Sequence, residues 1–599
     1  MVSNQDREVF KKLGISSILD LALIIPTSYE NLTIAKTLNY GTLALLDVTI
    51  QECTTTHILK IKLFAHDLDT YIQGIIFHPK YFHTKMFRVG QRYLLYGKVE
   101  QNYGVVQLIQ PKVVVKESGL IPKYKTPLQN KTLLSLVKRY VTKQNLEALG
   151  VKSEIVEDII NIHNPTMEFF LNYIKNSGFV GSHLKSIKYT EIYNHILKLS
   201  KLKTITKSLE ILDSDITSFI DSLPFKLTGD QKNVIKDVQN DLKQTISARR
   251  IIMGDVGSGK TMIILASVVI AYPHRSILLA PTTILARQIY DEAKKFLPSN
   301  IKVAFVSNKS KEENLQEYDF IIGTHALLYK ELPVTPLIMI DEQHRFGTKQ
   351  REAIKQLVNQ GDRQPHFLQF SATPIPRTMA MIQSSYIDIS TIKELPFKKD
   401  IDTKIIYPKD FTLITERIKS ESRENRQTII VYPLVESSEV IDYQSIDEAR
   451  GYWEKNFDDV YVTFGKDKNK EIVLEEFKNN GLVLLATTLI EVGISLPRLS
   501  TIIIVAPERL GLATLHQLRG RVSRNGLKGY CYLFTKKEPT KRIVEFCKTL
   551  DGFKIAQLDL NLRESGDLLK GEKQSGKEFN YFSMSDDEDI LLEVKEDFR

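Results

Sequence analysis

The sequence predicts a multidomain α/β protein with an all-β region near its N-terminus. Its 599 residues would make about four domains at roughly 150 residues each. Between Arg250 and Phe534, short apolar β-rich runs alternate with helical patterns, which is typical of parallel sheets covered on both faces. Nearer the N-terminus, several short runs alternate apolar and polar residues, which is typical of a small barrel or sandwich.

Composition and charge exclude several classes of protein. A hydrophobic fraction of 42% and a charged fraction of 26% argue against global disorder and collagen-like structure. Cys53, Cys531 and Cys547 form no CxxC pair, so a disulfide scaffold or zinc ribbon is not expected. The apolar runs are too short for a membrane helix, and MVSNQDREVFKK lacks a signal-peptide core. We expect a cytoplasmic protein without membrane contact, and its net charge of +9 permits a polyanionic partner.

The N-terminal part of the chain changes its pattern twice. Residues 1–35 have a mostly helical pattern that breaks at Pro26. Residues 36–120 carry period-two runs separated by turn residues and predict the all-β domain. Residues 121–222 return to helical spacing and predict a helical linker region. The expected strands are His57–Phe64, Tyr71–Phe77, Gln91–Gln101 and Val105–Ile109.

Two α/β domains are expected in tandem, at residues 223–395 and 396–545, with the join near Pro396. Residues 546–599 form the remaining C-terminal part, whose acidic run at residues 586–589 is typical of a tail. The strands expected in the first domain are Arg250–Met253, Ser276–Ala280, Phe320–Gly323, Leu337–Ile340 and Phe367–Phe370, and those in the second are Thr428–Tyr432, Val483–Thr487, Thr501–Val505 and Tyr530–Phe534.

A phosphate-binding loop follows the first strand of the tandem domains. The string GDVGSGKT, residues 254–261, matches G-x-x-x-x-G-K-[ST] between an apolar strand and a helix. Glycines let backbone N–H groups curl around phosphate oxygens at a helix N-terminus. Lys260 should reach the β- and γ-phosphates, and Thr261 should help to hold Mg²⁺. The loop predicts a nucleoside triphosphate site made of Gly254, Asp255, Gly257, Ser258, Gly259, Lys260 and Thr261.

An acidic pair supplies the second half of this predicted site. Asp341 and Glu342 follow the apolar strand PLIMI, at residues 336–340. A carboxylate at the end of a neighbouring buried strand can bind Mg²⁺ through water, which fits Asp341. Glu342 can orient or deprotonate the attacking water. His344 by itself is more typical of a structural role.

These motifs together resemble those of superfamily 2 helicases and translocases. DEQH after a P-loop is followed by Ser371-Ala372-Thr373, and QLRGRVSR, residues 517–524, is similar to the sixth motif of that superfamily. The resemblance implies that Arg521 and Arg524 project from the second domain towards the γ-phosphate, and that Gln517 of the same motif is a further catalytic residue. An arginine supplied across a cleft would stabilise charge on the transferred phosphoryl group and make hydrolysis depend on domain closure.

Longer strings resemble the RecG family of branch-migration translocases. They are GDVGSGKT, DEQHRFG, SATPIPRT and PERLGLATLHQLRGRVSR, and residues 551–576 resemble the translocation motif of that family. The resemblance implies an OB-fold wedge domain, two RecA-like doubly wound domains and a C-terminal helical hairpin. It implies an ATP- and Mg²⁺-dependent DNA helicase that migrates Holliday junctions and regresses stalled forks in recombination and repair. Branched DNA, a monomeric state and contact with a single-stranded-DNA-binding protein are also implied.

The resemblance assigns further residues to ligands. Gln231, in FKLTGDQ, resembles a residue that forms paired hydrogen bonds with adenine. Thr282, Thr324 and His325 lie in strings that resemble motifs contacting the nucleic-acid backbone, and Arg563 lies in the translocation motif. Within the barrel, the aromatic residues near basic side chains could stack on bases, or they could pack in the barrel core. These aromatic candidates are Phe77, Tyr81 and Phe82.

Some strings differ from the family pattern. Ser495 stands where aspartate is usual, and Phe464-Gly465-Lys466 replaces a His-Gly-Arg-like string. Arg563-Glu564-Ser565-Gly566 replaces an Arg-Gly-Pro-Gly turn. These differences put the coupling to translocation in question rather than ATP hydrolysis. Two alternatives follow: a general strand-separating DNA or RNA helicase without branch specificity, and a junction-binding clamp with weak ATPase activity.

Overall fold

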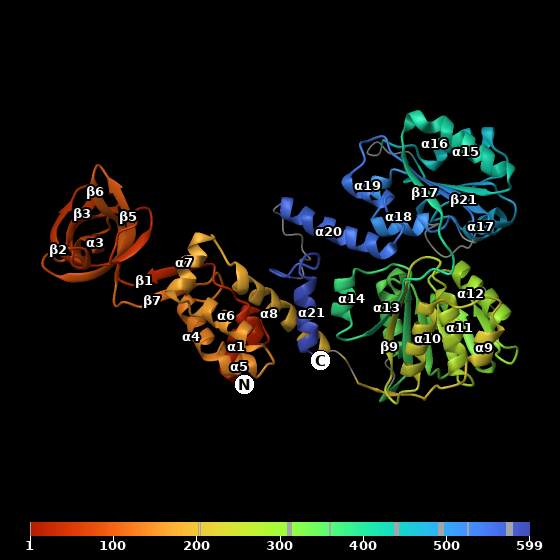
Figure 1. Cartoon of the computed structure of the whole chain (residues 1–599), viewed down its shortest axis with the longest axis horizontal. Coiled ribbons are helices and arrows are strands. Elements are labelled where there is room, and N and C mark those ends of the chain that lie inside the picture. Colours follow the sequence, from red (N-terminus) through yellow and green to blue (C-terminus); the bar gives the residue numbers. More distant parts are fainter. Residues whose placement is uncertain are drawn as a thin grey trace. The chain divides into compact units, whose positions relative to one another are not determined.

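The computed structural model describes residues 2–201, 203, 205–307, 314–358, 361–436, 442–488, 496–523, 526–570 and 579–598. The chain divides into two compact units. The first contains Met1–His195, Glu578–Phe582 and Asp589–Arg599, and the second contains Ile196–Lys577 and Ser583–Glu588. Figure 1 shows the elements of each unit.

Helices form one part of the first unit. Ser3 caps α1 by accepting a hydrogen bond from the Asp6 N–H, and Gly14 ends this helix with a φ of +71°. The helix α21 near the C-terminus packs with these N-terminal helices, because Lys152 forms an ion pair with Asp597 at 2.9 Å. The helices are α1 (Asn4–Leu13), α2 (Ile18–Ala22), α4 (Asn130–Tyr140), α5 (Lys143–Glu147), α6 (Ser153–His163), α7 (Met167–Lys175), α8 (Gly181–Ser200) and α21 (Glu588–Asp597).

The pattern of residues 1–35 predicts a helical segment, but part of this segment forms a strand in the structure. Ser28–Leu32 form a strand, β1, which pairs antiparallel with β7 (Gly119–Lys123). Pro26 does not continue a helix, and the partner strand lies far along the sequence, so local periodicity does not reveal the pairing. The same pairing places a strand at the start of the region expected to be a helical linker.

A closed five-stranded barrel forms the other part of the first unit, with the strand order β2-β3-β4-β6-β5. β4 and β6 pair in parallel and close it, whereas the other pairs are antiparallel. Alternate residues such as Leu59, Ile61 and Leu63 point into its core, as the period-two pattern predicts. The elements are β2 (Leu43–Thr55), β3 (Ile58–Ala65), η1 (His66–Leu68), β4 (Thr70–Phe77), α3 (Tyr81–Met86), β5 (Arg92–Asn102) and β6 (Val105–Val114).

The first lobe of the second unit is a seven-stranded parallel sheet with the order β11-β12-β10-β13-β15-β9-β16. Buried side chains pack on both of its faces. The strands are β9 (Arg249–Gly254), β10 (Ser276–Leu279), β11 (Val303–Val306), β12 (Phe320–Gly323), β13 (Leu337–Asp341), β15 (His366–Ser371) and β16 (Asp388–Ile392), and a separate pair joins β8 (Lys207–Ser208) to β14 (Arg363–Gln364).

Helices cover both faces of this sheet (Figure 1). Residues of α9 to α12 pack on one face, and residues of α13 pack on the other. The elements are α9 (Thr217–Ser222), α10 (Gly229–Leu242), α11 (Lys260–Ala271), α12 (Thr283–Phe296), η2 (Leu315–Glu317), η3 (His325–Tyr329), η4 (Gln343–Arg345), α13 (Thr348–Val358) and α14 (Arg377–Gln383).

The second lobe repeats this arrangement with a six-stranded parallel sheet in the order β17-β22-β21-β18-β20-β19. Residues of α15 and α16 pack on one face, and residues of α17 to α20 pack on the other. The elements are β17 (Ile401–Ile406), η5 (Pro408–Asp410), α15 (Phe411–Arg423), β18 (Gln427–Val431), α16 (Ile446–Asn456), β19 (Val460–Thr463), α17 (Lys470–Asn479), β20 (Val483–Ala486), β21 (Leu499–Val505), η7 (Pro507–Arg509), α18 (Leu512–Arg519) and β22 (Gly529–Phe534).

Two helices follow the second sheet, α19 (Lys541–Cys547) and α20 (Gly552–Lys570). α20 continues as one helix through residues 563–566, where the family resemblance implies a turn. The described residues do not define a second arm for the implied hairpin, because residues 571–578 lie outside them.

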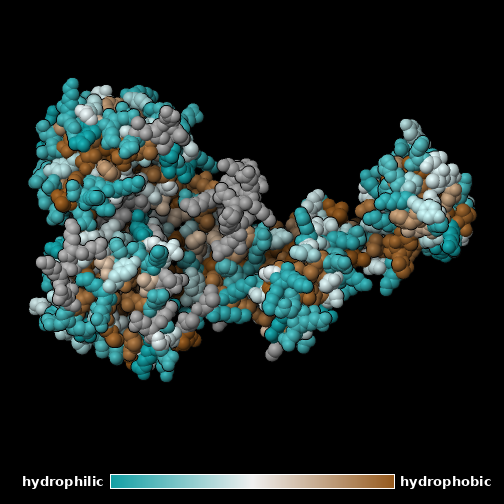
Figure 2. Space-filling view, turned by 180° about the vertical axis from the view of Figure 1, so that it is seen from behind, coloured by the Kyte–Doolittle hydropathy of each residue, from teal (hydrophilic) through white to brown (hydrophobic). Residues whose placement is uncertain are grey.

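The surface seen in Figure 2 is mostly hydrophilic, with apolar residues scattered over it. Such scattering is ordinary for a folded chain, since polar groups rarely cover a whole surface. Within the described residues, each helix is too short or too polar to cross a bilayer.

Candidate active site

The P-loop connects the end of β9 to the start of α11. Gly257 and Gly259 have φ angles of +83° and +80°, which glycine adopts without strain. A Cβ on Gly259 would also collide with Nε2 of Gln231. Because α11 begins directly after this turn, at Lys260, the loop offers backbone N–H groups and a helix N-terminus to an anion.

Lys260 lies against the backbone of its own loop. Its Nζ donates hydrogen bonds to the carbonyl oxygens of Gly254 at 2.7 Å and Asp255 at 3.1 Å. Burial lowers the pKa of Lys260, although the nearby carboxylates of Glu342 and Asp341 oppose this shift. Phosphate oxygens can replace the two carbonyl acceptors and would compensate the buried charge more fully.

The acidic pair lies where β13 ends beside β15. Glu342 has a φ of +50°, and its N–H donates to the Phe370 carbonyl oxygen at 2.8 Å. Its Oε1 accepts a hydrogen bond from the N–H of Ala372, in the Ser371-Ala372-Thr373 string. The backbone after β15 therefore fixes the carboxylate of Glu342 at the edge of the site.

Asp341 has the properties that a ligand of hydrated Mg²⁺ needs. Its Oδ1 is buried and has no hydrogen-bond partner among the described residues. Burial, together with the adjacent Glu342 carboxylate, raises the pKa of Asp341. A bound cation would offset the cost of burying the charged Asp341 carboxylate. The donor set therefore fits Mg²⁺ held by Asp341 and by Thr261, which lines the same cavity.

Both lobes line one cavity of about 650 Å³. Lys260, Thr261 and the acidic pair reach it from the first lobe, and Gln517 and Arg521 reach it from α18 and the turn after it. Gln517 Oε1 accepts a hydrogen bond from Arg345 Nη2, which links the two lobes. The structure thus brings the predicted P-loop, acidic pair, Gln517 and Arg521 together, whereas Arg524 and Ser495 lie outside the described residues.

Gln231 has a local structural role in addition to its predicted one. Its Oε1 accepts from the Thr228 N–H at 2.8 Å, which completes a capping box at the start of α10. Its Nε2 donates to the Ser258 carbonyl oxygen at 2.8 Å. Gln231 therefore holds the P-loop in place. To form paired hydrogen bonds with adenine, its amide group would have to give up the hydrogen bonds to Thr228 and Ser258. The pairing with adenine stays a prediction.

The residues predicted to contact the DNA backbone follow two neighbouring strands of the first sheet. Thr282 follows β10 and caps α12 by accepting from the Leu285 N–H at 3.3 Å. Thr324 follows β12 and accepts from the Ala326 N–H at 3.4 Å, and His325 comes next. β10 and β12 pair in parallel, so these residues lie at the same edge of the sheet.

The other predicted DNA-binding residues lie elsewhere. Phe77, Tyr81 and Phe82 lie at the end of β4 and in α3, with 45%, 74% and 52% of their surface exposed, so they are not core residues of the barrel. Arg563 lies in α20, but its side chain is outside the described part of the structure.

Sequence reasoning missed several side chains at or near the site. Arg345 and Phe397 line the nucleotide cavity. His516 and Lys399 contact the Asp255 carboxylate at 2.6 and 3.2 Å. The sequence gives no signal for the contact of His516, because its partner Asp255 lies 261 residues away in the chain.

A P-loop, an acidic pair and an arginine supplied by a second parallel-sheet lobe define a two-lobed helicase-type ATPase. Comparison with protein families agrees with this class. Residues 228–382 match the family DEAD/DEAH box helicase, and residues 409–526 match the helicase conserved C-terminal domain.

Comparison with whole proteins identifies the family. The chain is 44% identical to the ATP-dependent DNA helicase RecG of Helicobacter pylori over 98% of this chain and 97% of the relative. It is 32% identical to RecG of Aquifex aeolicus over 94% of this chain and 78% of the relative. A solved structure of RecG bound to a three-way DNA junction matches with a TM-score of 0.56 and 26% identity, covering 100% of this chain and 84% of that one. The chain belongs to the RecG family and is an ATP-dependent DNA helicase.

Proposed function

We propose that this helicase moves on duplex DNA, migrates Holliday junctions and regresses stalled replication forks in recombination and repair. The observation that carries the proposal is the cavity lined by Lys260 and Glu342 from one lobe and by Arg521 from the other. ATP bound there would draw the lobes together, and hydrolysis would release them. The RecG relative bound to a three-way junction supports branched DNA as the substrate.

The side chains around the cavity suit separate steps of hydrolysis. Lys260 would bind the β- and γ-phosphates, and Glu342 would orient the attacking water and accept its proton. Arg521 would stabilise charge on the phosphoryl oxygens, assisted by Gln517 and by Arg524. Mg²⁺ held near Thr261 and Asp341 would neutralise phosphate charge. Asp255, Gly254, Gly257, Ser258 and Gly259 would shape the cradle around the phosphates.

The barrel is proposed to act as an OB-fold wedge at the branch point. Its strand order and the position of α3 between β4 and β5 fit this fold. Tyr81 is 74% exposed, and Lys85 Nζ lies 4.5 Å from the centre of its ring. An exposed aromatic beside a cation suits stacking on a base next to the phosphate backbone.

We also propose an oligomeric state, a cellular location and a protein partner. We infer a monomer located in the cytoplasm, and we propose contact with a single-stranded-DNA-binding protein. α20, which carries Arg563, would follow the duplex as the lobes open and close. The first unit, 36–120 included, would then hold the branch while the lobes at 223–395 and 396–545 move the DNA.

A fork-regression assay with separately labelled arms tests the proposal. The enzyme should convert a DNA fork to a four-way junction in the presence of ATP and Mg²⁺ and should strip a plain duplex far more slowly. Equal rates on forks, plain duplexes and forks with an RNA arm would indicate a general helicase. Tight junction binding without ATP turnover would indicate a clamp.

A further inference from the structure

A stripe of side chains on α12 lines the large cavity between the lobes, and none of the steps proposed for hydrolysis uses it. The side chains are Leu285, Gln288, Glu292, Lys295 and Phe296. They recur at intervals of three or four residues, so they share one face of the helix. At roughly 1.5 Å per residue, the stripe is about 16 Å long. The cavity therefore extends along this helix, beyond the P-loop and the acidic pair.

An aromatic corner lies at the C-terminal end of the stripe. Phe225, in the segment before α10, also lines the cavity and is 45% exposed. Its ring meets the ring of Phe296 edge-on, with the ring centres 5.9 Å apart. Lys295 Nζ lies 4.9 Å from the centre of the Phe296 ring. Because Phe225 is exposed and faces the cavity, its ring can stack on the planar base of a nucleotide.

Gln231, the residue predicted to pair with adenine, presents little surface to the cavity, because it is 3% exposed. Its Oε1 already accepts from the Thr228 N–H and its Nε2 already donates to the Ser258 carbonyl oxygen, both at 2.8 Å. Breaking these bonds would leave backbone groups without partners at the P-loop. The fold therefore favours other polar partners for the base.

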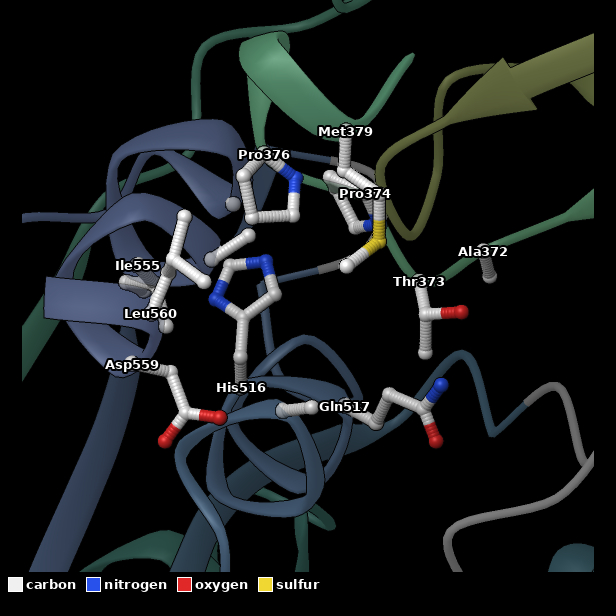
Figure 3. Close-up of a pocket in the computed structure, with 13 residues that line it drawn as sticks. Ala372, Thr373, Pro374, Pro376, Met379, His516, Gln517, Ile555, Asp559 and Leu560 are labelled. Carbon is white, nitrogen blue, oxygen red and sulfur yellow. The ribbon is translucent and has the colours of Figure 1, made fainter. Parts of the chain in front are cut away.

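A second, smaller cavity between the lobes does not suit the base. Figure 3 shows Pro374, Pro376 and Met379 of the first lobe around it, together with Ile555 and Leu560 of α20. Its volume is about 150 Å³, against about 650 Å³ for the cavity that contains the P-loop. The polar edge of a base buried against these apolar side chains would lose its hydrogen bonds to water. A nucleotide whose phosphates lie on the P-loop therefore places its base in the larger cavity.

Gln288 and Glu292 supply a donor and an acceptor on successive turns of α12. Gln288 Nε2 donates to Glu292 Oε1 at 3.4 Å, which is long for such a bond. A ligand with a donor next to an acceptor can replace this bond with two shorter ones. Adenine has this pattern, because its 6-amino group donates and its ring nitrogen N7 accepts. Guanine carries the acceptor oxygen O6 in place of the amino group, and the carboxylate of Glu292 would repel it.

We propose that Gln288 and Glu292 are specificity-determining residues that select adenine over guanine, with the base stacked on Phe225. Glu292 accepts from the 6-amino group, and Gln288 donates to N7. The inference rests on the proposed hydrolysis of ATP in this cavity and does not depend on movement along DNA. A site that pairs with a polar group discriminates strongly against a nucleotide in which this group is missing or reversed.

Glu292→Gln replaces the carboxylate with an amide that can accept from the adenine amino group or donate to guanine O6. The ratio of kcat/KM for ATP to kcat/KM for GTP should therefore fall by about tenfold or more, mainly through a lower KM for GTP. Steady-state turnover of each nucleotide at saturating fork DNA measures the ratio, and thermal unfolding checks that the variant is folded. An unchanged ratio in the folded variant would overturn the proposal.

Asp291→Asn is the matched control. Asp291 is the neighbouring acid on α12, is exposed, and pairs with Arg287 at 3.4 Å. It is not among the described side chains that line the cavity. Its substitution removes the same charge from the same helix and should leave the ratio within about twofold of the parent value. An equal fall in both variants would mean that the charge of the helix sets the preference, which contradicts a direct contact with the base.

A nucleotide without the 6-amino group, purine riboside triphosphate, tests the contact at the level of atoms. In the parent enzyme, this nucleotide should have a kcat/KM about tenfold below that of ATP, because the hydrogen bond to Glu292 is absent. In Glu292→Met, whose side chain cannot accept this bond, the two nucleotides should differ by less than about twofold. An equal difference in the parent and the variant would show that Glu292 does not contact the amino group.

Gln231→Met separates the two candidate readers of the base. Because Gln231 holds the P-loop, its replacement should lower kcat/KM for ATP and for GTP by the same factor and leave their ratio unchanged. A lower ratio in this variant, together with an unchanged ratio in Glu292→Gln, would assign base recognition to Gln231.

Photolabelling of the unmodified protein depends neither on the folding of a variant nor on turnover. ATP that carries a photoreactive aryl azide on its 6-amino nitrogen should label α12 within residues 283–296, and excess ATP should prevent this labelling. Labelling confined to other segments, or no labelling that ATP prevents, would overturn the proposal. If the parent enzyme hydrolyses neither ATP nor GTP, the proposed function fails, yet the label still tests the base site.

Discussion

At the scale of single residues, the proposed role of Lys260 in binding phosphate gives the most direct test of the site. Its ammonium lines the nucleotide cavity and donates hydrogen bonds to the loop carbonyl oxygens of Gly254 and Asp255. Lys260→Ala should lower ATP turnover by about 100-fold or more, because the variant lacks the ammonium group that would stabilise the negative charge of the phosphates. DNA binding should stay within about threefold. Steady-state turnover and fork titrations measure the two effects.

Lys232→Ala is the control for that substitution, because Lys232 is exposed on the nearby helix α10. It should leave both measurements unchanged. Turnover that persists in Lys260→Ala would remove the P-loop from the mechanism, and a joint loss of turnover and DNA binding would indicate misfolding.

His163 makes the stability of the first unit depend on pH. Nε2 donates to the Ala22 carbonyl oxygen at 2.8 Å, so Nδ1 must accept from the Tyr124 hydroxyl at 2.8 Å. Burial lowers the pKa of His163 from 6.5 to about 4. Stability is complete above pH 6.5 and is lost as pH falls from 6.5 through 4, by about 2 kcal/mol at pH 5.

Pulse proteolysis in urea at pH 7 and pH 5, followed by cleavage within residues 153–175, measures this effect. His163→Asn cannot titrate, so its loss of stability between the two pH values should be smaller than that of the parent by about 2 kcal/mol. Equal losses in the two proteins would show that other groups cause the acid sensitivity.

At the scale of elements, the sequence predicts the interior strands of both parallel sheets and misses their edges. All nine predicted strands lie inside the sheets, and Phe320–Gly323 agrees with β12 at both ends. β11, β16, β17 and β19 were not predicted, and each lies at a sheet edge. An interior strand is covered on both faces and reads as a continuous apolar run, whereas an edge strand tolerates polar residues, such as Asp388 in β16 and Thr403 in β17. β11, with the sequence VAFV, is apolar throughout, so this difference does not explain why it was missed.

The same distinction applies to the candidate site. The P-loop and the acidic pair are local strings whose chemistry depends on adjacent residues, so they could be predicted. The contact of His516 with Asp255 and the bracing of the P-loop by Gln231 depend on how distant elements pack. Local patterns hold no information about such contacts.

Glu191 ties the segment before α21 to the helix α8. Its carboxylate accepts hydrogen bonds from the N–H groups of Asn580 at 2.7 Å, Tyr581 at 2.8 Å and Phe582 at 2.8 Å. Glu191→Gln removes the charge and one acceptor oxygen, so the attachment should weaken by roughly 1–3 kcal/mol. Hydrogen exchange at these three amides should speed up accordingly.

Glu168→Gln on the exposed side of α7 is the matched control and should leave that exchange unchanged. Unchanged exchange in Glu191→Gln would mean that α21 holds the segment by itself, through Lys152 and Lys185, which pair with Glu593 at 3.5 and 2.8 Å.

At the scale of the whole molecule, salt should distinguish two kinds of contact with DNA, those to phosphates and those to bases. Phosphate contacts release counterions, so affinity should fall with salt with a log–log slope of about −0.9 for each contact. Base stacking on the barrel releases none and should favour branched DNA over plain duplex. Tyr81→Ala should therefore weaken fork binding by roughly tenfold and leave both duplex binding and the salt slope unchanged.

Tyr103→Ala tests whether any exposed barrel aromatic has this effect. Tyr103 is fully exposed, at 100%, in the turn between β5 and β6, away from the Phe77, Tyr81 and Phe82 group in sequence. It should leave the preference for forks intact in titrations between 50 and 200 mM salt, a range chosen because roughly six phosphate contacts would change affinity about 10³-fold there. A flatter slope for Tyr81→Ala, or an equal loss on forks and duplexes, would mean that the barrel holds the backbone and that another part of the chain recognises the branch.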